Sequence, residues 1–230
     1  MRVAIISAYH GETLETIRRC HDSVLSQTHK ADHILIGDGK SHDTIDDWDC
    51  QHVRLPQAHR DYGDTPRAIG TVMAYTQGYD ALCWVDADNW LEPDHVARAV
   101  EASQGRVVTI PRFLRWPNGD PIDVCTESDG VAFNDTNCYF VPREYMPLGA
   151  SWAFKTTDAA VGDRHVWAAF QDAPLARSDK ATINYTTTIA FHYLQRGLVP
   201  PPEAKVLIKT DPSSPFISMP YTMYQKLTGQ

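Results

Sequence analysis

The stretch CWVDADNWLEPDH, residues 83–95, decides the fold expected of this 230-residue chain. It overlaps the apolar run ALCWV (81–85), which is typical of a buried strand. Two carboxylates, Asp86 and Asp88, come directly behind that run, and PDHVARAVEA (93–102) then has the apolar spacing of a helix. In an extended strand end, residues i and i+2 project to the same side, so we expect both carboxylates to face one point.

Strand-like and helix-like segments alternate outward from this stretch. The strand-like segments are VAIISA (3–8), HILIG (33–37), HVRL (52–55) and ALCWV (81–85). The helix-like segments are an apolar stripe through Leu14, Ile17, Val24 and Leu25, the segment from about Arg67 to Tyr79, and residues 93–102. This alternation predicts a mostly parallel sheet covered by helices on both faces. Ligands of such sheets bind at the carboxyl ends of the strands, where we expect Asp86 and Asp88 to lie.

The second half of the chain is less regular. Asn118-Gly119 between two strand-like runs predicts a hairpin, and NCYFV (137–141) predicts a further strand. We expect a helix from about Asp163 to Phe170 and strand-like structure in ATINYTTTIAFHY (181–193). Residues 200–220 are rich in proline, which favours a tail along the surface over a core element.

The composition fits one α/β domain with a proper core, or at most one domain plus a small appendage, since hydrophobic residues make up 43% of the chain. Within residues 1–230 we expect three parts, namely 1–105, 106–199 and the proline-rich tail 200–230. Asp and Glu number 29 against 21 Lys and Arg, giving a net charge of −8. This charge disfavours a general electrostatic affinity for nucleic acid or anionic lipid.

The sequence also carries expectations about location and redox state. The N-terminal apolar run is too short for a signal peptide, and nowhere do 18 apolar residues follow one another. We therefore expect a soluble, cytoplasmic protein. The cysteines are odd in number and form no C-x-x-C pair, so we expect reduced core residues at Cys20, Cys50, Cys83, Cys125 and Cys138.

The paired aspartates point to a metal site. Carboxylates as close as Asp86 and Asp88 repel each other, and a divalent cation removes that cost. Carboxylate oxygens suit Mg²⁺ or Mn²⁺, which commonly keep waters and complete their shell with substrate phosphates. The alternative interpretation is that Asp88 or Asn89 only caps the turn into the helix that Pro93 begins.

Several segments, in order, resemble the GT-A glycosyltransferases of the family 2 type. They are SAYHGETLETIRRCHDSVLSQTH (7–29), ILIGDGKSHDT (34–44) and GDTPRAIGTVMAYTQGYDALCWVDADNWLEPDHV (63–96). The resemblance covers about the first 105 residues. It implies a Rossmann-like GT-A fold with a smaller mixed region on the acceptor side. It also implies transfer of a sugar from a nucleotide-diphosphate donor, with a UDP-sugar as the leading candidate. Residues 1–105 would then bind the donor, and 106–199 would carry the acceptor side and the catalytic group.

The resemblance implies a role for each matching position. The D-x-D element would supply Asp86 to the ribose and Asp88 to the metal. The other donor-binding candidates are Ala8, Tyr9, Glu12, Asp38 and Arg67. Ordinary interpretations stay open for three of these, namely an edge aromatic at Tyr9, a turn former at Asp38 and a solvated helix face at Arg67. The chain departs from the family pattern at Gly37 and Asn89, where acidic residues often stand, and at Ala68-Ile69.

The resemblance also implies a catalytic base and a further metal ligand. Inverting members use a carboxylate at the start of a late helix to take the proton of the acceptor hydroxyl, and VGDRHVWAAF (161–170) is the best match. Asp163 is therefore the expected base, with Asp158 in reserve, and helix capping is the alternative for Asp163. His192 would complete the metal shell as in several GT-A enzymes and would favour Mn²⁺. A packed core histidine is the alternative.

The acceptor is specified least. We expect a glycan, a lipid-linked acceptor or a small molecule. Aromatic residues that suit sugar rings, but that are equally often core residues, are Trp116, Trp152, Tyr139, Tyr221 and Tyr224. Peripheral contact with a membrane through PFISMPYTMYQKL (215–227) stays open, although Lys226 is the only basic residue there and the attraction would be weak.

Three rival functions remain from the sequence. One is a retaining GT-A glycosyltransferase, and another is a degenerate relative that binds a sugar nucleotide or glycan without turnover. A sugar-phosphate nucleotidyltransferase would need a glycine-rich, basic loop after the first strand to hold a triphosphate. The segment SAYHGETLE (7–15) offers one glycine and no lysine, which disfavours that third class.

Overall fold

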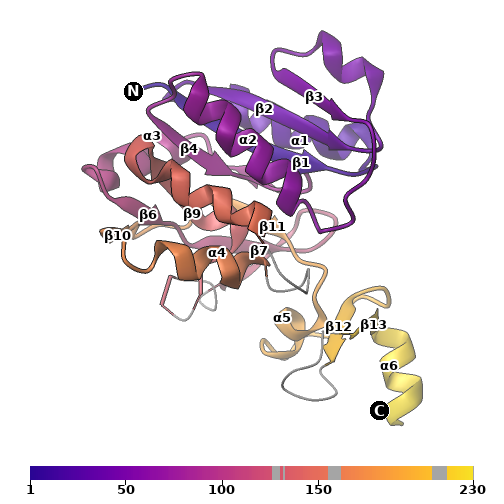
Figure 1. Cartoon of the computed structure of the whole chain (residues 1–230). Coiled ribbons are helices and arrows are strands. Elements are labelled where there is room, and N and C mark those ends of the chain that lie inside the picture. The colour runs from indigo at the N-terminus through magenta and orange to yellow at the C-terminus, as the bar shows by residue number, and fades with distance from the viewer. Residues whose placement is uncertain (126–129, 132, 155–161, 209–216, 230) are drawn as a thin grey trace. The chain divides into compact units, whose positions relative to one another are not determined.

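The computed structural model describes residues 1–125, 130–131, 133–154, 162–208 and 217–229 (Figure 1). The strands are β1 (Val3–Tyr9), β2 (Ala31–Asp38), β3 (Gln51–Leu55), β4 (Ala81–Trp84), β5 (Trp90–Leu91), β6 (Val107–Thr109), β7 (Arg112–Arg115), β8 (Pro121–Cys125), β9 (Tyr139–Pro142), β10 (Leu175–Arg177), β11 (Ile183–Thr186), β12 (Lys205–Ile208) and β13 (Ile217–Pro220). The α-helices are α1 (Leu14–Leu25), α2 (Asp64–Thr76), α3 (His95–Ser103), α4 (Gly162–Phe170), α5 (Ala190–Leu194) and α6 (Tyr221–Thr228). The 3₁₀ helices are η1 (Asp43–Asp47), η2 (Thr136–Cys138) and η3 (Arg143–Phe154).

The central sheet has seven strands in the order β10-β6-β9-β4-β1-β2-β3. β1 pairs in parallel with β2 and β4, β2 with β3, and β6 with β10. β9 runs antiparallel to both of its neighbours, β4 and β6. A second sheet has the order β5-β11-β7-β8. The predicted α/β fold, with a mostly parallel central sheet and a smaller mixed region, is confirmed.

Helices cover both faces of the central sheet because side chains alternate along each buried strand. One face carries Ala4, Ile6 and Leu82, which pack with residues of α2, η3 and α4. The other face carries Ile5 and Cys83, which pack with residues of α1 and α3. Figure 1 shows α2 and α4 on one side of the sheet, as expected from the first of these clusters.

The two helices nearest the predicted site begin at defined points. α1 follows Thr13, whose side chain accepts a hydrogen bond from the Thr16 amide at 3.2 Å, as an N-cap does. α2 follows Gly63, which has a φ of 88°. A Cβ at this position would lie 3.2 Å from the Ala8 Cβ and from Nη1 of Arg67. Glycine therefore allows α2 to start against the end of β1, with Arg67 in its first turn.

The chain separates into two compact units, one formed by residues 1–113 and 124–185 and the other by 114–123 and 186–230. In the second unit β12 pairs antiparallel with β13, and a small core contains Ala190, Tyr193 and Ala204. The expectation of a single domain over 1–230 stays a prediction. The turn at Asn118-Gly119 lies between β7 and β8, as expected of a hairpin, and Gly119 has a φ of 93°.

One local prediction was wrong. Of the strand-like segment 181–193, only Ile183–Thr186 is a strand, and Ala190–Leu194 is the helix α5. The Thr187 side chain accepts a hydrogen bond from the Ile189 amide at 3.3 Å, a local bond that competes with strand pairing. Residues 200–220 contain β12 and β13, whose side chains are exposed or half-buried, and α6 follows directly. The expectation of a segment along the surface stays a prediction. Pro220 precedes α6, a position where its missing N–H costs no helical hydrogen bond.

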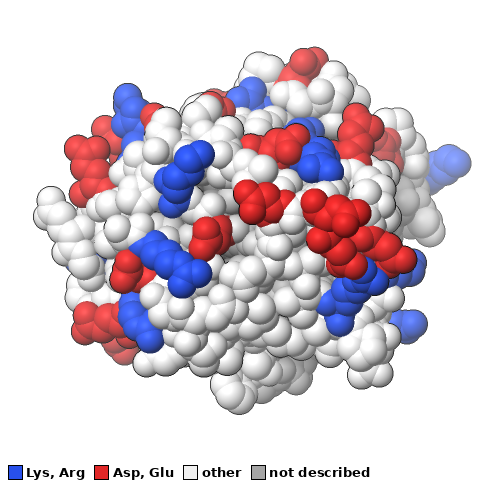
Figure 2. All heavy atoms as spheres, turned by 90° about the horizontal axis from the view of Figure 1, so that it is seen from above, with Lys and Arg blue, Asp and Glu red and all other residues white. Residues whose placement is uncertain are grey.

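The surface is mixed in charge. Figure 2 shows acidic and basic side chains interspersed over one face, with several acidic side chains gathered at one edge and no continuous basic area on that face of the described residues. All five cysteines are free, and Cys50 alone is not fully buried. Among the helices that the structure describes, each is too short or too polar to cross a membrane.

Candidate active site

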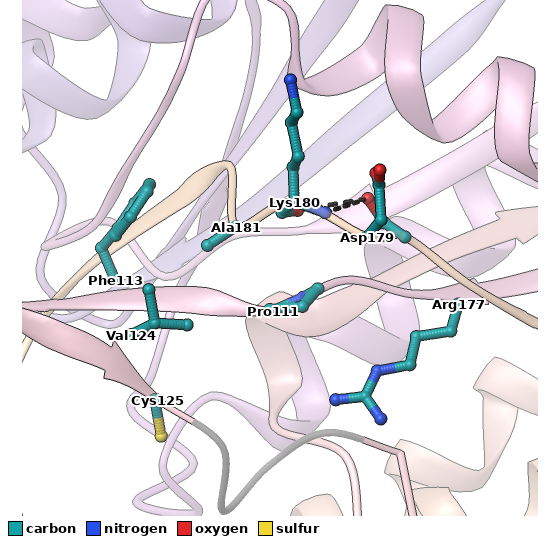
Figure 3. A pocket seen from close by; sticks show the side chains of 9 residues that line it. Pro111, Phe113, Val124, Cys125, Arg177, Asp179, Lys180 and Ala181 are labelled. Atoms are coloured by element: carbon teal, nitrogen blue, oxygen red, sulfur yellow. Dashed lines mark hydrogen bonds between the residues drawn. The ribbon is translucent and has the colours of Figure 1, made fainter.

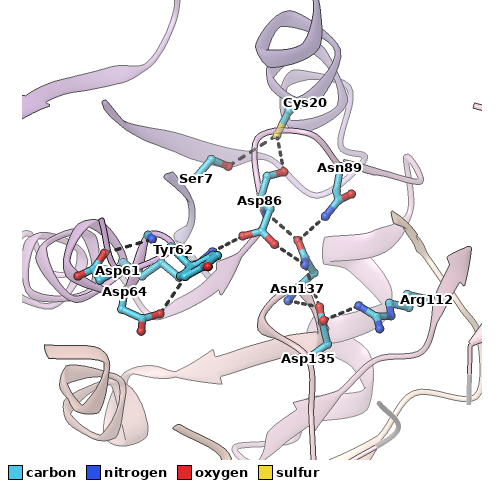
Figure 4. Close-up of polar contacts among 12 residues, drawn as sticks. Ser7, Cys20, Asp61, Tyr62, Asp64, Asp86, Asn89, Arg112, Asp135 and Asn137 are labelled. Atoms are coloured by element: carbon cyan, nitrogen blue, oxygen red, sulfur yellow. Dashed lines mark hydrogen bonds and ion pairs between the residues drawn. The ribbon is translucent and has the colours of Figure 1, made fainter. Parts of the chain in front are cut away.

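A partly buried ion pair between Arg67 and Asp86 lies where the carboxyl ends of β1 and β4 meet. Nη2 of Arg67 is 2.5 Å from Oδ1 of Asp86, and Nη1 of Arg67 donates to the Tyr62 carbonyl at 2.9 Å (Figure 4). Arg67 is 8% exposed. Burial alone would lower its pKa, but the charges of Asp86 and Asp64 raise it above the ordinary value. Arg67 is therefore charged and does not belong to a solvated helix face.

Asn137 holds the other oxygen of Asp86. Its Nδ2 donates to Oδ2 of Asp86 at 2.9 Å and to Oδ1 of Asp135 at 2.8 Å. Its Oδ1 accepts from the Asp86 amide at 2.7 Å and from Nδ2 of Asn89 at 3.2 Å. Figure 4 shows Asp86, Asn89, Asp135 and Asn137 converging in this way. The Asp86 carboxylate is thus held on both oxygens.

Asp135 is itself paired with Arg112, which is 3% exposed and lies over the Tyr185 ring with its Cζ 3.9 Å from the ring centroid. Burial would raise the pKa of Asp135, but Arg112 and Asn137 hold that pKa below its ordinary value. No sequence motif discussed above indicated Arg112, Asp135 or Asn137 as site residues. The available signal was the polar run NDTN (134–137) directly before a predicted strand.

Asp88 lies in the turn after β4 and is crowded by negative charge. Burial, followed by the charges of Asp86 and Glu12, raises the pKa of its carboxyl group to about 7. Nη2 of Arg19 donates to the Asp88 carbonyl at 2.8 Å, and the guanidinium lies over the Trp90 ring at 4.0 Å. A cation near the Asp88 carboxylate would relieve this crowding, so the residues present fit a metal ion.

The described residues contain no group of three or more His, Cys, Asp or Glu side chains that could hold a metal by themselves. Mg²⁺ and Mn²⁺ sites often need only one or two protein carboxylates, because water and substrate phosphates fill the remaining positions. A site at Asp88 would be of that kind. The prediction of Mn²⁺ or Mg²⁺ stays a prediction.

The remaining donor-binding candidates lie at the ends of β1 and β2. Asp38 is 4% exposed, and its carboxylate accepts from Nδ1 of His59 at 2.6 Å. Tyr9 is buried, and its hydroxyl lies 2.6 Å from Nε2 of His52. Glu12 accepts a hydrogen bond from the His10 amide at 2.5 Å. Tyr9 of β1 and Asp38 of β2 therefore each contact a histidine of the protein. Ala8 lies beside the start of α2.

The departure from the family pattern at Gly37 has a steric reason. A Cβ at Gly37 would lie 2.4 Å from Oγ of Ser41 and 2.8 Å from the Tyr9 hydroxyl. Distances below 3.0 Å are closer than Cβ contacts in proteins allow, so an aspartate does not fit here without a shift of its neighbours. Ser41 and Tyr9 fill the space that an acidic side chain would need.

Asp163 lies in the first turn of α4, as predicted, and its Oδ1 accepts from the Arg164 amide at 2.8 Å. Burial, followed by the charge of Asp135, raises the pKa of its carboxyl group to about 6. A Cβ on Gly162 would lie 2.7 Å from both carboxylate oxygens of Asp64, the residue that also contacts Arg67. The start of α4 is thus packed closely on the start of α2. The reserve candidate Asp158 lies outside the described residues.

His192 belongs to the second unit. It is 8% exposed, and its Nδ1 lies 2.5 Å from Oγ1 of Thr187. Its role as a metal ligand stays a prediction. Among the aromatic candidates for the acceptor site, Trp152 and Tyr139 are buried in the core, and the Trp116 ring packs on Tyr193 at 4.6 Å. Tyr221 packs against the small core of the second unit, and Tyr224 is half-buried.

A pocket of about 660 Å³ lies elsewhere in the first unit (Figure 3). Phe113 of β7 lines it, together with Val124 and Lys180 among others. Arg112, the preceding residue of β7, instead reaches Asp135. Consecutive strand residues point to opposite faces of a sheet. The pocket therefore lies on the side of β7 away from the Arg112–Asp135 ion pair and contains no residue of the candidate site.

Comparisons with known proteins agree on fold and family. The family model described as glycosyl transferase family 2 matches residues 4–122, more than half of the chain. The crystal structure of S. aureus TarS 1–349 has 15% identity and a TM-score of 0.59, covering 84% of this chain and 63% of that one. Its complex with UDP has 14% identity and a TM-score of 0.58, with the same coverage, 84% and 63%. The complex with UDP-GlcNAc has 12% identity and a TM-score of 0.58, covering 81% and 59%.

At these identities the structural likeness shows the fold, and the chain spans less than two thirds of TarS 1–349. No curated protein sequence matches the chain. The family match includes residues 7–29, 34–44 and 63–96, the segments that suggested the resemblance, and it also includes Arg67 and Asp86. The predicted GT-A, family 2-like fold is confirmed. The chain belongs to glycosyl transferase family 2.

Proposed function

We propose that the chain transfers a sugar from a nucleotide-diphosphate donor, with a UDP-sugar first in order, to an acceptor hydroxyl with inversion at the sugar. The observation that carries the proposal is the crowding of negative charge at Asp88. Burial and the neighbouring acids Asp86 and Glu12 raise the pKa of its carboxyl group to about 7. A crowded acidic group beside an arginine-held aspartate suits a cation and a diphosphate. Family membership and the solved complexes of S. aureus TarS with UDP and UDP-GlcNAc support this choice of donor.

The donor would bind at the carboxyl ends of β1, β2 and β4. Asp86 would contact the ribose, and the family-based donor contacts at that edge are Ala8, Tyr9, Glu12, Asp38 and Arg67. Asp88 would hold Mn²⁺ or Mg²⁺, with His192 as a proposed further ligand. A bound cation would supply stabilisation of the charge that develops on the leaving diphosphate.

Asp163 would act as the general base. A carboxyl group with a pKa of about 6 is mostly ionised at pH 7 and still accepts a proton more readily than an ordinary aspartate. Burial is the largest cause of the raised pKa of Asp163, and the charge of Asp135 is the second. Asp163 would take the proton of the acceptor hydroxyl as the new bond forms. The acceptor would be a glycan, a lipid-linked molecule or a small molecule.

A screen of nucleotide sugars with and without Mn²⁺ tests the proposal. Thermal stabilisation that requires both components shows binding, because a ligand held only by the folded state raises the melting temperature. Hydrolysis or transfer of the same donor distinguishes an enzyme from a binder, and the anomeric configuration of the product distinguishes inversion from retention. The proposal fails if no nucleotide sugar stabilises the chain, or if the Asp88→Ala variant retains full Mn²⁺-dependent transfer.

A further inference from the structure

The side-chain amide of Asn137 uses all of its hydrogen-bonding capacity inside the candidate site. Asn137 is 0% exposed. Its Nδ2 donates to the carboxylates of Asp86 and Asp135, and its Oδ1 accepts from the Asp86 amide and from Asn89. One amide therefore joins the turn that follows β4 to the segment that precedes β9.

These partners allow only one orientation of the amide. The backbone N–H of Asp86 can only donate, so it requires the oxygen of Asn137. Oδ2 of Asp86 and Oδ1 of Asp135 are hydrogen-bond acceptors in these contacts, so they require the nitrogen of Asn137. A flipped amide would place like partners together at each of these contacts. The position of Asp86 is thus coupled to an amide that cannot turn.

Asn89 completes this arrangement. Its Nδ2 donates to Oδ1 of Asn137 at 3.2 Å. An aspartate at position 89, where the family often has an acidic residue, would present an acceptor to that same oxygen. The departure at Asn89 is therefore matched to Asn137, and the two amides act as a pair.

We propose that Asn137, with Asn89, is a positioning residue for donor binding that fixes the Asp86 carboxylate between its own amide and Arg67. Both Asp86 oxygens then have a protein partner, Oδ1 at Arg67 and Oδ2 at Asn137. This leaves the Asp86 carboxylate aligned before the nucleotide arrives. The inference rests on the proposed function, because it assigns a role in binding the donor of that same site.

Asn134 offers a matched control, since it lies three positions earlier and is also 0% exposed. Its Nδ2 donates to the Cys138 carbonyl at 2.8 Å, away from Asp86. Asn134→Ala and Asn137→Ala therefore each remove a buried amide from the same segment. A purely structural role for Asn137 predicts that both variants lose thermal stability and that neither changes nucleotide affinity in the folded protein.

The test measures binding of UDP, GDP and dTDP, each with Mn²⁺, by calorimetry. All variants are measured at one temperature, about 15 °C below the melting temperature of the least stable variant, so that every chain is folded. Asn137→Ala should weaken binding of the preferred diphosphate about tenfold or more, as for residues that orient a ligand-holding group. Asn134→Ala should bind as the unmodified chain does. Asn89→Asp should also weaken binding, and it serves alone if Asn137→Ala does not fold.

The outcomes separate the two proposals. If the unmodified chain binds none of the three diphosphates, the proposed function is wrong and this inference falls with it. If the unmodified chain binds and Asn137→Ala or Asn89→Asp binds within twofold, this inference alone is wrong. Equal weakening in Asn134→Ala would likewise show that loss of any buried amide in this segment is sufficient, which overturns the positioning role.

Discussion

The guanidinium of Arg67 and the carboxylate of Asp86 form an ion pair between the first turn of α2 and the turn after β4, with Nη2 2.5 Å from Oδ1. The Arg67 side chain is 9% exposed and that of Asp86 28% exposed. The Arg67 guanidinium also lies 5.0 Å from the Trp152 ring centroid. Arg67 thus connects the turn after β4 to the helix α2.

Removing this arginine should destabilise the protein and weaken donor binding. Breaking a fully buried pair costs about 3–5 kcal/mol, and partial exposure of Asp86 reduces the expected loss for Arg67→Met to roughly 2 kcal/mol. Urea unfolding measures the loss. Arg98→Met is the control: Arg98 lies on α3 and forms a half-exposed pair with Asp94, the residue before the helix, so its loss should cost under about 0.5 kcal/mol. Equal losses in both variants would contradict a special role for the Arg67–Asp86 pair.

Asp88 should destabilise the metal-free protein above neutral pH. Its pKa is raised to about 7 in the folded state from the ordinary 3.8, so ionisation costs stability as pH rises from about 4 to 7. Asp88→Asn should therefore be more stable than the unmodified chain by about 4 kcal/mol at pH 8, with little difference at pH 4.

Thermal unfolding in EDTA at both pH values measures this effect of Asp88→Asn. The exposed Asp22 supplies the control, because Asp22→Asn should change stability little at either pH. Added Mn²⁺ with UDP should stabilise the unmodified chain and not Asp88→Asn. If the stability difference between Asp88→Asn and the unmodified chain is the same at pH 8 as at pH 4, charge is not crowded at this position.

Asp163 should govern turnover and leave donor binding unchanged. Asp163→Asn is expected to lower kcat by roughly 10²-fold or more, because it removes a general base. In the unmodified enzyme kcat should rise with pH through about 6 and then level off, since the base works in its ionised form. Steady-state kinetics between pH 5 and 8 test both points.

The matched control for Asp163 is Asp172→Asn, an exposed change just beyond the other end of α4. It should leave kcat and its pH dependence unchanged. Undiminished turnover in Asp163→Asn would return that residue to helix capping.

Gly162→Ala should disturb the start of α4. Its Cβ would lie 2.7 Å from both oxygens of Asp64, so either the helix or Asp64 must move. Overpacking of this kind costs about 1–3 kcal/mol, and displacement of Asp163 should lower kcat as well. Ala168→Ser, an exposed change on the same helix, should do neither. Full kcat together with full stability in Gly162→Ala would show that the close approach to Asp64 has no consequence.

Much of the fold follows from local pattern. The turn after β4 and the helix carrying Arg67 were expected from the sequence, and the structure brings Arg67 and Asp86 together. The bounds of α2 differ by three residues at each end. It starts earlier because Gly63 adopts a positive φ before it, and it ends earlier because Gly78 does so after it.

The part of the site that was missed depends on long-range pairing. Asn137 is 51 positions from Asp86 along the chain, and no spacing rule links them. Their contact requires β9 to pair with β4, which aligns Val141 with Leu82. Arg112 was missed for the same reason, since its partner Asp135 lies on a different segment. Local sequence patterns identify the residues at strand ends. Which strands pair with each other depends on the packing of the whole core, which local patterns do not describe.

The direction of β9 explains where the missed residues had to be. A strand that runs against its neighbours begins at the edge where they finish, so its leading residues reach the ligand-binding rim that the parallel strands reach with their trailing ones. Asp135 and Asn137 hold this leading position. In any mostly parallel sheet with one reversed member, the residues ahead of that member therefore merit the same scrutiny as those behind the others.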